Sequence, residues 1–492
     1  MRLSKLINKY CQADDLKNIE VTGICDDSKK VSKGDIFVII ERKNFDIFSI
    51  IEKVEPKVCA FLADIKAKNK LTKLVKNKPL ILVKDINREF ERLCDVFYDF
   101  KKNSLKFIAI TGTNGKTTSA YCIYTLLKSL GLNVALISTI EYRISTTTIK
   151  ANHTTPDFLT LRKIFKNISD CGGGYVVMEV SSHAIDQARI KGIPFIRCLF
   201  TNLSRDHLDY HKTIAKYFNT KKRFLLENRK ALTLINLDDK YGKQIYPKLK
   251  NKLSYAIQAP ADFRAEDIVL SKEETSFIAR RGAKSYRLKI RLLGRHNVYN
   301  VLGSLGLVNS LGFSLKRIIS NCNKLRSVEG RLEQVEKNIF VDYAHTPDGL
   351  KNVFCCLKQI GYRNIISVFG CGGNRDKGKR QMMGKIACKE SYFSFITSDN
   401  PREEDPLLIC REIARGFKKD NYSVVVSRRD AIIKALKLLQ RMQDLNNQGN
   451  DCKYCLLVAG KGHEDYQIIG KTKYPFKDKS LIIDILNQKI KV

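Results

Sequence analysis

The sequence contains no tryptophan and only seven histidines among its 492 residues. It also lacks any apolar stretch that approaches the roughly 18 residues required for a membrane-spanning helix. The first ten residues lack the apolar segment of a secretory signal peptide. We therefore expect a cytoplasmic protein without a membrane span.

Paired cysteine motifs are scarce, although the chain has 15 cysteines. Cys452 and Cys455 form a single CxxC motif, and no second pair completes the spacing of a zinc site. Cysteines scattered through a long chain without a signal peptide favour a reduced compartment over a disulfide framework. We expect free thiols and no structural zinc.

Acidic residues are the scarcer charged class, because 51 Asp and Glu face 88 Lys and Arg, a net charge of +37. Residues 104–330 hold most of the surplus, with 37 basic and 16 acidic side chains. Such a surplus predicts attraction to nucleic acid, to an acidic membrane surface, or to small phosphorylated and carboxylated substrates. An AT-rich genome would also encode a chain that is rich in Lys, Ile and Asn and has no Trp. Base composition is therefore an alternative source of the charge.

Length and composition predict an ordered protein of about three domains. Hydrophobic residues make up 43% and charged residues 28%, the balance of a globular protein with several cores. An amphipathic helix is expected over residues 90–102, and strand and helix patterns alternate after it. We predict the α/β class, with a small N-terminal α/β domain (1–103), a central P-loop ATPase-type domain with a mostly parallel sheet (104–330), and a C-terminal Rossmann-like, doubly wound domain (331–492).

A phosphate-binding loop is predicted at Thr111-Gly-Thr-Asn-Gly-Lys-Thr-Thr118. An apolar strand over 107–110 precedes it, and a helix that ends near Gly131 follows it, with a second strand at 134–137. Glycines let backbone N–H groups approach phosphates, Lys116 can reach the terminal phosphates, and the Thr117 hydroxyl suits Mg²⁺. The sequence therefore predicts an ATP site, although its G-x-x-G-K-T spacing is shorter than the usual one.

Two further segments carry residues that suit a metal or a reacting phosphate. Glu179 ends an apolar strand that begins at Tyr175, and a carboxylate in that position can hold Mg²⁺. A surface carboxylate at a strand end is the alternative reading of Glu179 alone. The segment Asp206-His-Leu-Asp-Tyr-His211 packs two His and two Asp into six residues, and Lys221-Lys-Arg223 follows it. All seven histidines fall in polar motif segments, which favours an extended active site over scattered structural histidines.

The C-terminal third predicts five short strands, over 339–341, 365–369, 392–397, 422–426 and 454–458, separated by helices. Four of these strands run into polar loops, which begin at Asp342, Gly370, Ser398 and Gly460. Ligands bind beyond the carboxyl ends of the strands in such sheets. We therefore expect the four loops to form one site.

Together these motifs resemble the Mur ligase family of peptidoglycan synthesis, from about Ser28 to Gln467. The resemblance implies an ATP- and Mg²⁺-dependent acid–amino-acid ligase. It implies that His207, Glu179, Thr117 and Lys221 hold Mg²⁺, that Lys116, His207 and Lys221 are catalytic, and that Lys221 is carbamylated, with Lys222 as the competing assignment. It assigns ATP contacts to Gly112, Thr113, Asn114, Gly115, Lys116, Thr117, Thr118, Asn297, Asn300, Arg331 and Asp342.

Within the family, the motifs are most similar to the branch that adds the third residue of the stem peptide to UDP-N-acetylmuramoyl-L-Ala-D-Glu. The resemblance implies that this substrate contacts Ser28, Thr154, Thr155, Ser181, Gln187 and Arg189. The form Asp399-Asn-Pro-Arg402 is associated with meso-diaminopimelate as the added residue. Meso-diaminopimelate carries a second amino-acid group at the far end of its side chain. A pocket for that group needs cations to bind the carboxylate and an anion to bind the ammonium. The implied contacts are Arg375, Asp399, Asn400, Pro401, Arg402, Gly460 and Glu464.

Alternatives remain at this point: an L-lysine-adding ligase, a folylpolyglutamate-synthase-like ligase, or a non-catalytic relative associated with nucleic acid. A monomer is expected, and no nucleic-acid motif is present. Two departures from the family pattern stand out. Asn374 replaces an Asp, and the segment Glu41-Arg-Lys-Asn-Phe-Asp46 lacks the expected Asp-Gly turn.

Overall fold

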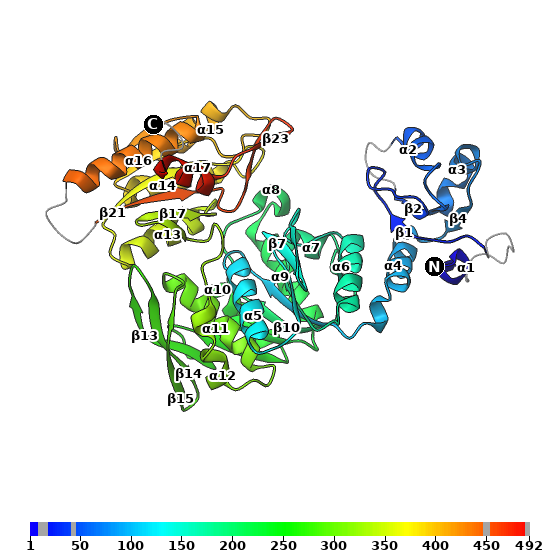
Figure 1. Ribbon diagram of the computed structural model, residues 1–492, viewed down its shortest axis with the longest axis horizontal. Helices are drawn as coiled ribbons and strands as arrows, with labels where there is room; N and C mark the ends of the chain where they lie inside the picture. The colour runs from blue at the N-terminus through cyan, green and yellow to red at the C-terminus, as the bar shows by residue number, and fades with distance from the viewer. Residues whose placement is uncertain (8–17, 41–45, 446–452, 488–492) are drawn as a thin grey trace. The chain divides into compact units, whose positions relative to one another are not determined.

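The computed structural model describes residues 1–7, 18–40, 46–445 and 453–487 (Figure 1). The chain forms two compact units. Unit 1 comprises residues 1–105, 156–174 and 187–192, and unit 2 comprises residues 106–155, 175–186 and 193–492. Unit 1 thus takes in two segments from within the range 104–330. The departure at residues 41–45 and Cys452 of the CxxC motif lie outside the described residues.

Unit 1 is built on a four-stranded parallel sheet whose strands follow chain order. Its strands are β1 (Gly23–Cys25), β2 (Asp35–Ile39), β3 (Ala60–Asp64) and β4 (Leu80–Val83). Its helices are α1 (Leu3–Ile7), α2 (Ile47–Val54), α3 (Lys68–Leu74), α4 (Ile86–Phe97) and α6 (Phe158–Asp170). Asp85 caps α4 by accepting a hydrogen bond from the backbone N–H of Arg88. The helix predicted over 90–102 is therefore present but ends at Phe97, and a 3₁₀ turn follows it over Phe100–Lys102.

Unit 2 contains an eleven-stranded sheet in the order β15-β14-β13-β12-β11-β10-β5-β9-β6-β7-β8. The strands from β13 to β6 pair in parallel, whereas β13–β14, β14–β15, β6–β7 and β7–β8 are antiparallel. The strands are β5 (Lys106–Thr111), β6 (Val134–Ile137), β7 (Glu141–Ile144), β8 (Thr147–Lys150), β9 (Tyr175–Glu179), β10 (Phe195–Phe200), β11 (Leu232–Asn236), β12 (Lys252–Ala256), β13 (Phe263–Leu270), β14 (Thr275–Arg281) and β15 (Lys284–Ile290).

Helices α5 (Lys116–Ser129) and α11 (Arg295–Asn309) share the main core of this sheet. Ile123 of α5 and Leu302 of α11 are fully buried in it, together with Ile108 of β5. The other helices of this part are α7 (Ser182–Asp186), α8 (Leu208–His211), α9 (Ile214–Glu227), α10 (Lys240–Ile245) and α12 (Leu315–Ile319). The strand, loop and helix predicted around the phosphate loop are therefore confirmed.

A second, six-stranded sheet lies in the C-terminal part of unit 2, with the order β16-β17-β21-β18-β19-β20. Its strands are β16 (Glu333–Glu336), β17 (Ile339–Asp342), β18 (Asn364–Phe369), β19 (Phe393–Ile396), β20 (Tyr422–Val424) and β21 (Tyr454–Ala459). All neighbours pair in parallel except β16 and β17. The five predicted strands are therefore present, each within a few residues of its predicted bounds.

Helices cover both faces of this second sheet (Figure 1, yellow to red). Helices α13 (Pro347–Gln359), α14 (Gly378–Glu390) and α15 (Pro406–Ala414) bury one apolar face, and α16 (Arg428–Leu445) and α17 (Asp478–Leu486) bury the other. A small hairpin of β22 (Tyr466–Ile469) and β23 (Thr472–Pro475) precedes α17. The doubly wound arrangement predicted from the strand and helix alternation is confirmed.

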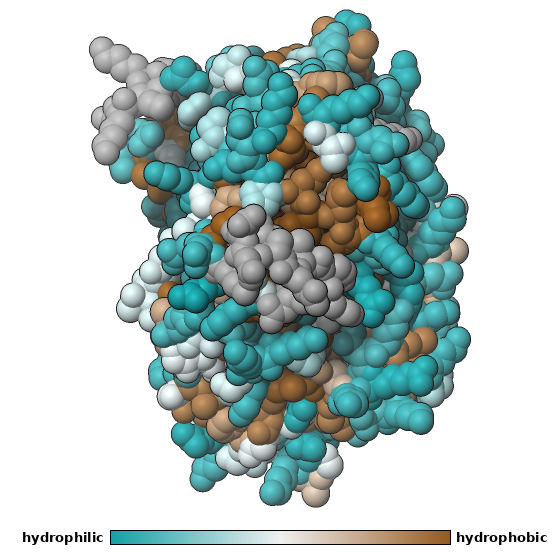
Figure 2. Space-filling view, turned by 90° about the vertical axis from the view of Figure 1, so that its right-hand side faces the viewer, coloured by the Kyte–Doolittle hydropathy of each residue, from teal (hydrophilic) through white to brown (hydrophobic). Residues whose placement is uncertain are grey.

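Polar side chains cover most of the face shown in Figure 2, with smaller hydrophobic areas between them. Six basic side chains of the described residues are buried: Arg162, Lys221, Lys379, Arg380, Arg428 and Lys461. Most of the charge surplus is therefore carried where solvent reaches it. Every helix in the described part of the chain is too short or too polar to cross a bilayer.

Candidate active site

The phosphate loop joins β5 to α5 through two glycines with positive φ, 148° at Gly112 and 84° at Gly115. A Cβ at Gly112 would collide with the Thr201 hydroxyl oxygen, and one at Gly115 with the amide oxygen of Asn300. Only glycine therefore satisfies both the backbone conformation and the space. The loop is held by the backbone N–H of Thr113, which donates to the carbonyl of Asn202 at 2.8 Å.

Lys116 begins α5 and folds its ammonium back over the loop. Its Nζ donates to the carbonyls of Gly112 at 3.1 Å and Thr113 at 2.8 Å. Loss of hydration inside the loop lowers the pKa of Lys116, although Glu179 and Asp206 oppose the shift. The ammonium therefore lies over a glycine-rich turn at a helix N-terminus, which is an arrangement that binds phosphate.

Glu179 lies at the end of β9, beside the phosphate loop, and it is fully buried. Its Oε2 accepts hydrogen bonds from the hydroxyls of Thr117 and Thr139, both at 3.1 Å, and its Oε1 accepts from the backbone N–H of Thr139 at 2.8 Å. Parallel pairing of β5 with β9 brings the two strand ends together. The surface-carboxylate reading of Glu179 is therefore wrong.

Lys221 and Lys222 separate onto different sides of α9. The Lys221 side chain is 1% exposed, and its Nζ donates to the Thr111 hydroxyl at 3.1 Å, just before the phosphate loop. Burial and the nearby charge of Lys116 lower the pKa of Lys221 well below its ordinary value. Lys222 instead lines a pocket on the far side of α9, over the ring of Phe218. Of the two lysines, only Lys221 reaches the phosphate loop.

His207 adopts a left-handed backbone conformation, with φ of 54°, at the start of α8. Its Nε2 lies 3.3 Å from Asp206 Oδ2, which also lies 4.0 Å from His345 Nε2. Burial lowers the pKa of His207. For Asp206, the nearby charges of His207 and His345 outweigh the effect of burial, so its pKa is lowered as well. The imidazole is therefore neutral near pH 7, the state in which a histidine can ligate a metal.

The residues implied as adenine contacts lie on α11. Asn297 and Asn300 are buried, and the Asn300 amide donates to Asn297 Oδ1 at 2.9 Å. Ser119 of α5 lies 3.4 Å from Asn300 Oδ1, which ties this pair to the first turns after the phosphate loop. The two amides therefore lie beside the loop that would hold the phosphates.

Arg331 and Asp342 bring the C-terminal part of unit 2 to the loop. Arg331 Nη2 donates to the Thr117 hydroxyl at 3.2 Å, and the guanidinium lies 4.5 Å from the ring centre of Tyr343. Asp342 accepts hydrogen bonds from the backbone N–H groups of Leu332 and Ala344. Burial raises the pKa of Asp342 to about 6 despite the opposing charge of Arg331.

The residues implied for the muramoyl dipeptide divide between the two units. Ser28, Gln187 and Arg189 belong to unit 1, whereas Thr154, Thr155 and Ser181 belong to unit 2. In unit 2, the Thr155 hydroxyl donates to the Glu179 carbonyl at 2.8 Å and accepts from the Ser181 N–H at 3.1 Å. Thr154 lies 3.1 Å from the Thr139 hydroxyl, and Thr139 in turn donates to the Glu179 carboxylate, so the three side chains lie near the end of β9.

The four polar loops of the second sheet meet at one edge, as predicted. Asn400 Nδ2 donates to Glu464 Oε2 at 2.8 Å, and the Gly460 N–H donates to the Asp342 carbonyl at 3.0 Å. A Cβ at Gly460 would press on the Asp399 carboxylate, so a glycine is required there as well. The implied amino-acid contacts at Arg375, Asp399, Asn400, Pro401, Arg402, Gly460 and Glu464 all lie on these converging loops or directly beside them.

Two arginines flank this cluster. Arg402 Nη1 donates to the Gly373 carbonyl at 2.8 Å, and burial together with Arg375 lowers the pKa of Arg402. Arg375 Nη1 lies 3.1 Å from Asp209 Oδ2, and half of its side chain remains exposed. Asn374, which departs from the family pattern, has φ of 51° and donates its backbone N–H to Glu404 at 2.5 Å. Asn tolerates this conformation better than most residues, so the loop keeps its turn without the Asp.

Sequence reasoning missed two buried cations behind the amino-acid cluster. Lys461 Nζ is fully buried and donates to Asn400 Oδ1 at 3.2 Å and to Glu464 Oε2 at 3.1 Å. Arg428 pairs with Asp478 and donates to the Ala459 carbonyl at 2.9 Å, immediately before Gly460. Lys461 follows Gly460 in a polar loop, which is a signal that could have drawn attention to it. No local pattern marks Arg428, because its partners lie more than 30 residues away.

The donor set fits a hard divalent cation only in part. The Thr117 hydroxyl and the Glu179 carboxylate offer oxygen ligands in direct contact with each other, as Mg²⁺ prefers. No cluster of three or more His, Cys, Asp and Glu side chains in the described residues could alone hold a metal ion. A Mg²⁺ ion here would therefore need the hydroxyl of Thr117, phosphate oxygens and a further oxygen group such as a carbamate.

Comparison with known proteins gives consistent matches. Residues 110–308 match the Mur ligase middle domain, and residues 330–461 match the glutamate ligase domain of Mur ligases. A UDP-N-acetylmuramoyl-L-alanyl-D-glutamate--2,6-diaminopimelate ligase of Clostridium acetobutylicum is 39% identical, over 99% of this chain and all of its own. The corresponding ligase of Clostridium botulinum is 37% identical over 95% of this chain and 96% of its own.

Solved structures agree with these matches. A structure described as a UDP-N-acetylmuramoyl-L-alanyl-D-glutamate--2,6-diaminopimelate ligase covers both chains completely, with a TM-score of 0.66 and 28% identity. A Mycobacterium tuberculosis folylpolyglutamate synthase complexed with ADP covers 75% of this chain and 90% of its own, with a TM-score of 0.61 and 17% identity. The second likeness is one of fold alone.

Proposed function

This chain belongs to the Mur ligase family, and from that membership we propose that it joins meso-2,6-diaminopimelate to the D-Glu side-chain carboxylate of UDP-N-acetylmuramoyl-L-Ala-D-Glu, using ATP. The relatives cited above that carry this activity in their names align along nearly the whole chain. The product would be a precursor of peptidoglycan, made in the cytoplasm.

The observation that carries the proposal is the convergence of Arg402, Arg375 and Glu464 at the edge of the second sheet. Diaminopimelate has a second amino-acid head, with one carboxylate and one ammonium. Two guanidinium groups can bind the carboxylate, and Glu464 can accept hydrogen bonds from the ammonium. L-Lysine lacks the far carboxylate, so an arginine at residue 402 would have no partner on that substrate.

The reaction proceeds in two steps. The substrate carboxylate attacks the γ-phosphorus of ATP, the bond to the β-phosphate oxygen breaks, and an acyl phosphate and ADP form. The neutral amine of diaminopimelate then attacks the acyl carbon through a tetrahedral intermediate. Phosphate leaves, and the amine loses a proton as the amide forms.

Lys116 and the N–H groups of the phosphate loop stabilise the charge that develops during the first step. Arg331 reaches the same place from the C-terminal part of unit 2, where its guanidinium touches Thr117. The amides of Asn297 and Asn300 contact the adenine, and Asp342 meets the nucleotide from the C-terminal part of unit 2. The remaining loop residues, Thr113, Asn114 and Thr118, shape the phosphate cradle.

Thr117, Glu179, His207 and a carbamate on Lys221 would hold Mg²⁺, which supplies positive charge to the phosphates when it is bound. Burial lowers the pKa of Lys221 and so favours its neutral amine, which is the form that reacts with CO₂. Carbamylation would add an anionic carboxylate to that nitrogen. Its oxygens would supply the metal ligand that the other side chains do not provide.

Phosphate release from ATP and UDP-N-acetylmuramoyl-L-Ala-D-Glu tests the proposal, with meso-diaminopimelate, L-lysine or no amine offered as the acceptor. We expect turnover that depends on diaminopimelate. If neither diaminopimelate nor lysine gave turnover, the ligase assignment would be contradicted. A preference for lysine would contradict the role of Arg402. Turnover with a folate substrate and L-glutamate would favour the folylpolyglutamate-synthase-like alternative.

A further inference from the structure

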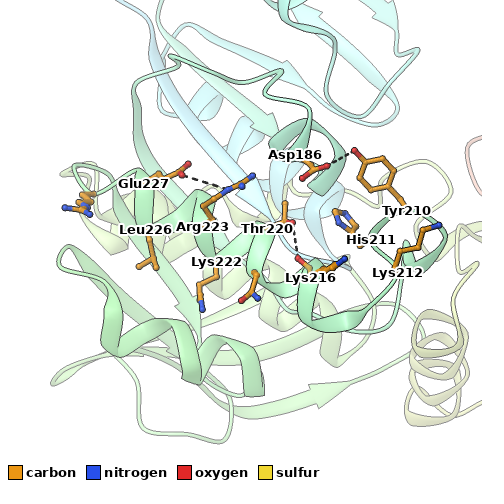
Figure 3. A pocket seen from close by; sticks show the side chains of 12 residues that line it. Asp186, Tyr210, His211, Lys212, Lys216, Thr220, Lys222, Arg223, Leu226 and Glu227 are labelled. Atoms are coloured by element: carbon orange, nitrogen blue, oxygen red, sulfur yellow. Dashed lines mark hydrogen bonds and ion pairs between the residues drawn. The ribbon is translucent and has the colours of Figure 1, made fainter. Parts of the chain in front are cut away.

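A pocket of about 770 Å³ lies on the side of α9 that faces away from Lys221, and the functions proposed above do not use it (Figure 3). All of its lining residues belong to unit 2. Its volume is typical of small-molecule sites. The lining includes five basic side chains and two acidic ones: Lys212, Lys216, Lys222, Arg223, Arg229, Asp186 and Glu227.

Helix geometry explains why the basic side chains form a row. Lys216, Asn219 and Arg223 recur at spacings of three and four, so they share one face of α9. The buried face of the same helix carries Tyr217 and Lys221. The row from Lys216 to Arg223 spans about two turns, or roughly 10 Å at 1.5 Å per residue. A single small anion can contact only one part of such a row.

The two acidic side chains of the lining do not neutralise this row. Asp186 accepts a hydrogen bond from the Tyr210 hydroxyl at 2.7 Å. Glu227 lies 3.9 Å from Arg223, and both side chains are more than half exposed, so this pair contributes little. Lys216, Lys222 and Arg229 have no ion pair among the described residues.

His211 supplies a second, independent sign of a ligand. Its side chain lines the pocket and is 6% exposed, and its Nε2 is buried without a hydrogen-bond partner. A buried, unpaired polar atom is costly, and native proteins rarely keep one without a partner. The ring would have to turn toward the pocket for a bound ligand to reach Nε2, and a ligand there would then provide the missing partner.

We propose that this pocket binds a small molecule with a chain of two or three phosphate groups, held by Lys216 and Arg223 on one face of α9, with the His211 ring turned toward it to donate a hydrogen bond. Several linked phosphates match the length of the basic row, and Lys and Arg are the residues that bind phosphate. A concave pocket of this size suits a small molecule better than the extended track that nucleic acid needs.

Calorimetric titration with inorganic tripolyphosphate tests the proposal in the full-length Lys116→Ala protein, in which binding at the phosphate loop is weakened. We expect K216E/R223E to weaken binding at least tenfold, and K216A/R223A to do so to a smaller extent. The matched control K248E/K250E exchanges two exposed lysines away from the pocket and should bind as the parent does. Equal affinity of parent and K216E/R223E, or no binding by the parent, would overturn the proposal.

Two further arms identify the ligand chemistry. Cytidine triphosphate binding more tightly than tripolyphosphate would assign the site to nucleotides, and equal binding would assign it to the phosphate chain itself. The NMR signal of the labelled His211 ring, assigned with His211→Asn, should shift on addition of tripolyphosphate and should not shift in K216E/R223E. An oligonucleotide that binds through Lys216 and Arg223 and is not displaced by tripolyphosphate would overturn the proposal in favour of nucleic acid.

Discussion

At the residue scale, adjacent side chains of the same type have different environments. Lys221 is buried beside Thr111, whereas Lys222 lines the pocket on the other side of α9. Arg402 lies partly buried behind Gly373, whereas Arg375 is half exposed next to Asp209. Burial changes which protonation state and which partners are available, so it also decides what each side chain can do.

Replacement of the adjacent lysines Lys221 and Lys222 of α9 should give different results. We expect Lys221→Ala to reduce turnover by about 10²-fold or more, because it removes the group next to the phosphate loop. Added acetate or formate should restore part of the rate by supplying the missing carboxylate. Lys222→Ala is the matched control and should stay within about twofold of the parent in the phosphate-release assay. An unchanged rate for Lys221→Ala would remove this residue from the mechanism.

Replacement of Arg402 should change the use of one substrate only. We expect Arg402→Ala to raise the KM for diaminopimelate more than tenfold, because a carboxylate loses its guanidinium partner. The KM for ATP should change less than twofold, and exposed Arg411 on α15 provides the control Arg411→Ala. Steady-state kinetics with each substrate varied separately measure both effects. A parallel rise in both KM values would indicate a general structural role instead.

Asp342 should make stability depend on pH. Its pKa is raised to about 6 in the folded protein, so the folded state binds its proton more tightly than the unfolded state does. Its contribution to stability is therefore greatest below about pH 4 and is lost as the pH rises through about 6. Asp342→Asn cannot titrate, so the melting temperature of the parent relative to this variant should fall between pH 4 and pH 6.5. A constant difference would contradict the raised pKa.

At the element scale, a buried ion pair connects three elements behind the amino-acid cluster. Arg428 at the start of α16 contacts Asp478 at the start of α17 and the carbonyl at the end of β21, and both charged side chains are fully buried. The loop that begins at Gly460 continues directly from that strand. The pair thus fixes where the Gly460 loop leaves the sheet.

Breaking this pair should be costly, whereas removing both charges should not. We expect Arg428→Met to lower the free energy of unfolding by about 3–5 kcal/mol, because Asp478 remains buried without a partner. The double variant R428M/D478L should recover much of that loss. Lys289→Met, which breaks an exposed pair with Glu274, should cost less than about 1 kcal/mol. Urea unfolding of all three variants measures the differences, and equal losses for the single and double variants would contradict the prediction.

At the scale of the whole molecule, the sign of the net charge of +37 agrees with the anionic substrates proposed above. Most of the basic side chains lie at the surface, so their charge acts at long range and is screened by salt. The base composition of the source genome stays the alternative source of the positive charge.

The surface charge should give weak, non-specific attraction to nucleic acid without a functional role. We expect binding to duplex DNA at 50 mM salt to weaken by about 10³-fold or more at 200 mM salt. Ligase turnover should be unaffected by added DNA at 200 mM salt. Filter binding and phosphate release measure the two quantities. Salt-resistant DNA binding without amine-dependent turnover would favour the nucleic-acid alternative.

The sequence by itself determined the features that depend on neighbouring residues. The phosphate loop, the five C-terminal strands and their polar loops were predictable because each arises from one short segment whose pattern dictates strand, turn or helix. The tertiary structure alone decided which of Lys221 and Lys222 reaches the loop, that Lys461 is bound to Glu464, and that Arg428 is paired with Asp478. These contacts join residues that packing brings together from distant segments, and the side of a helix that becomes buried depends on what packs against it.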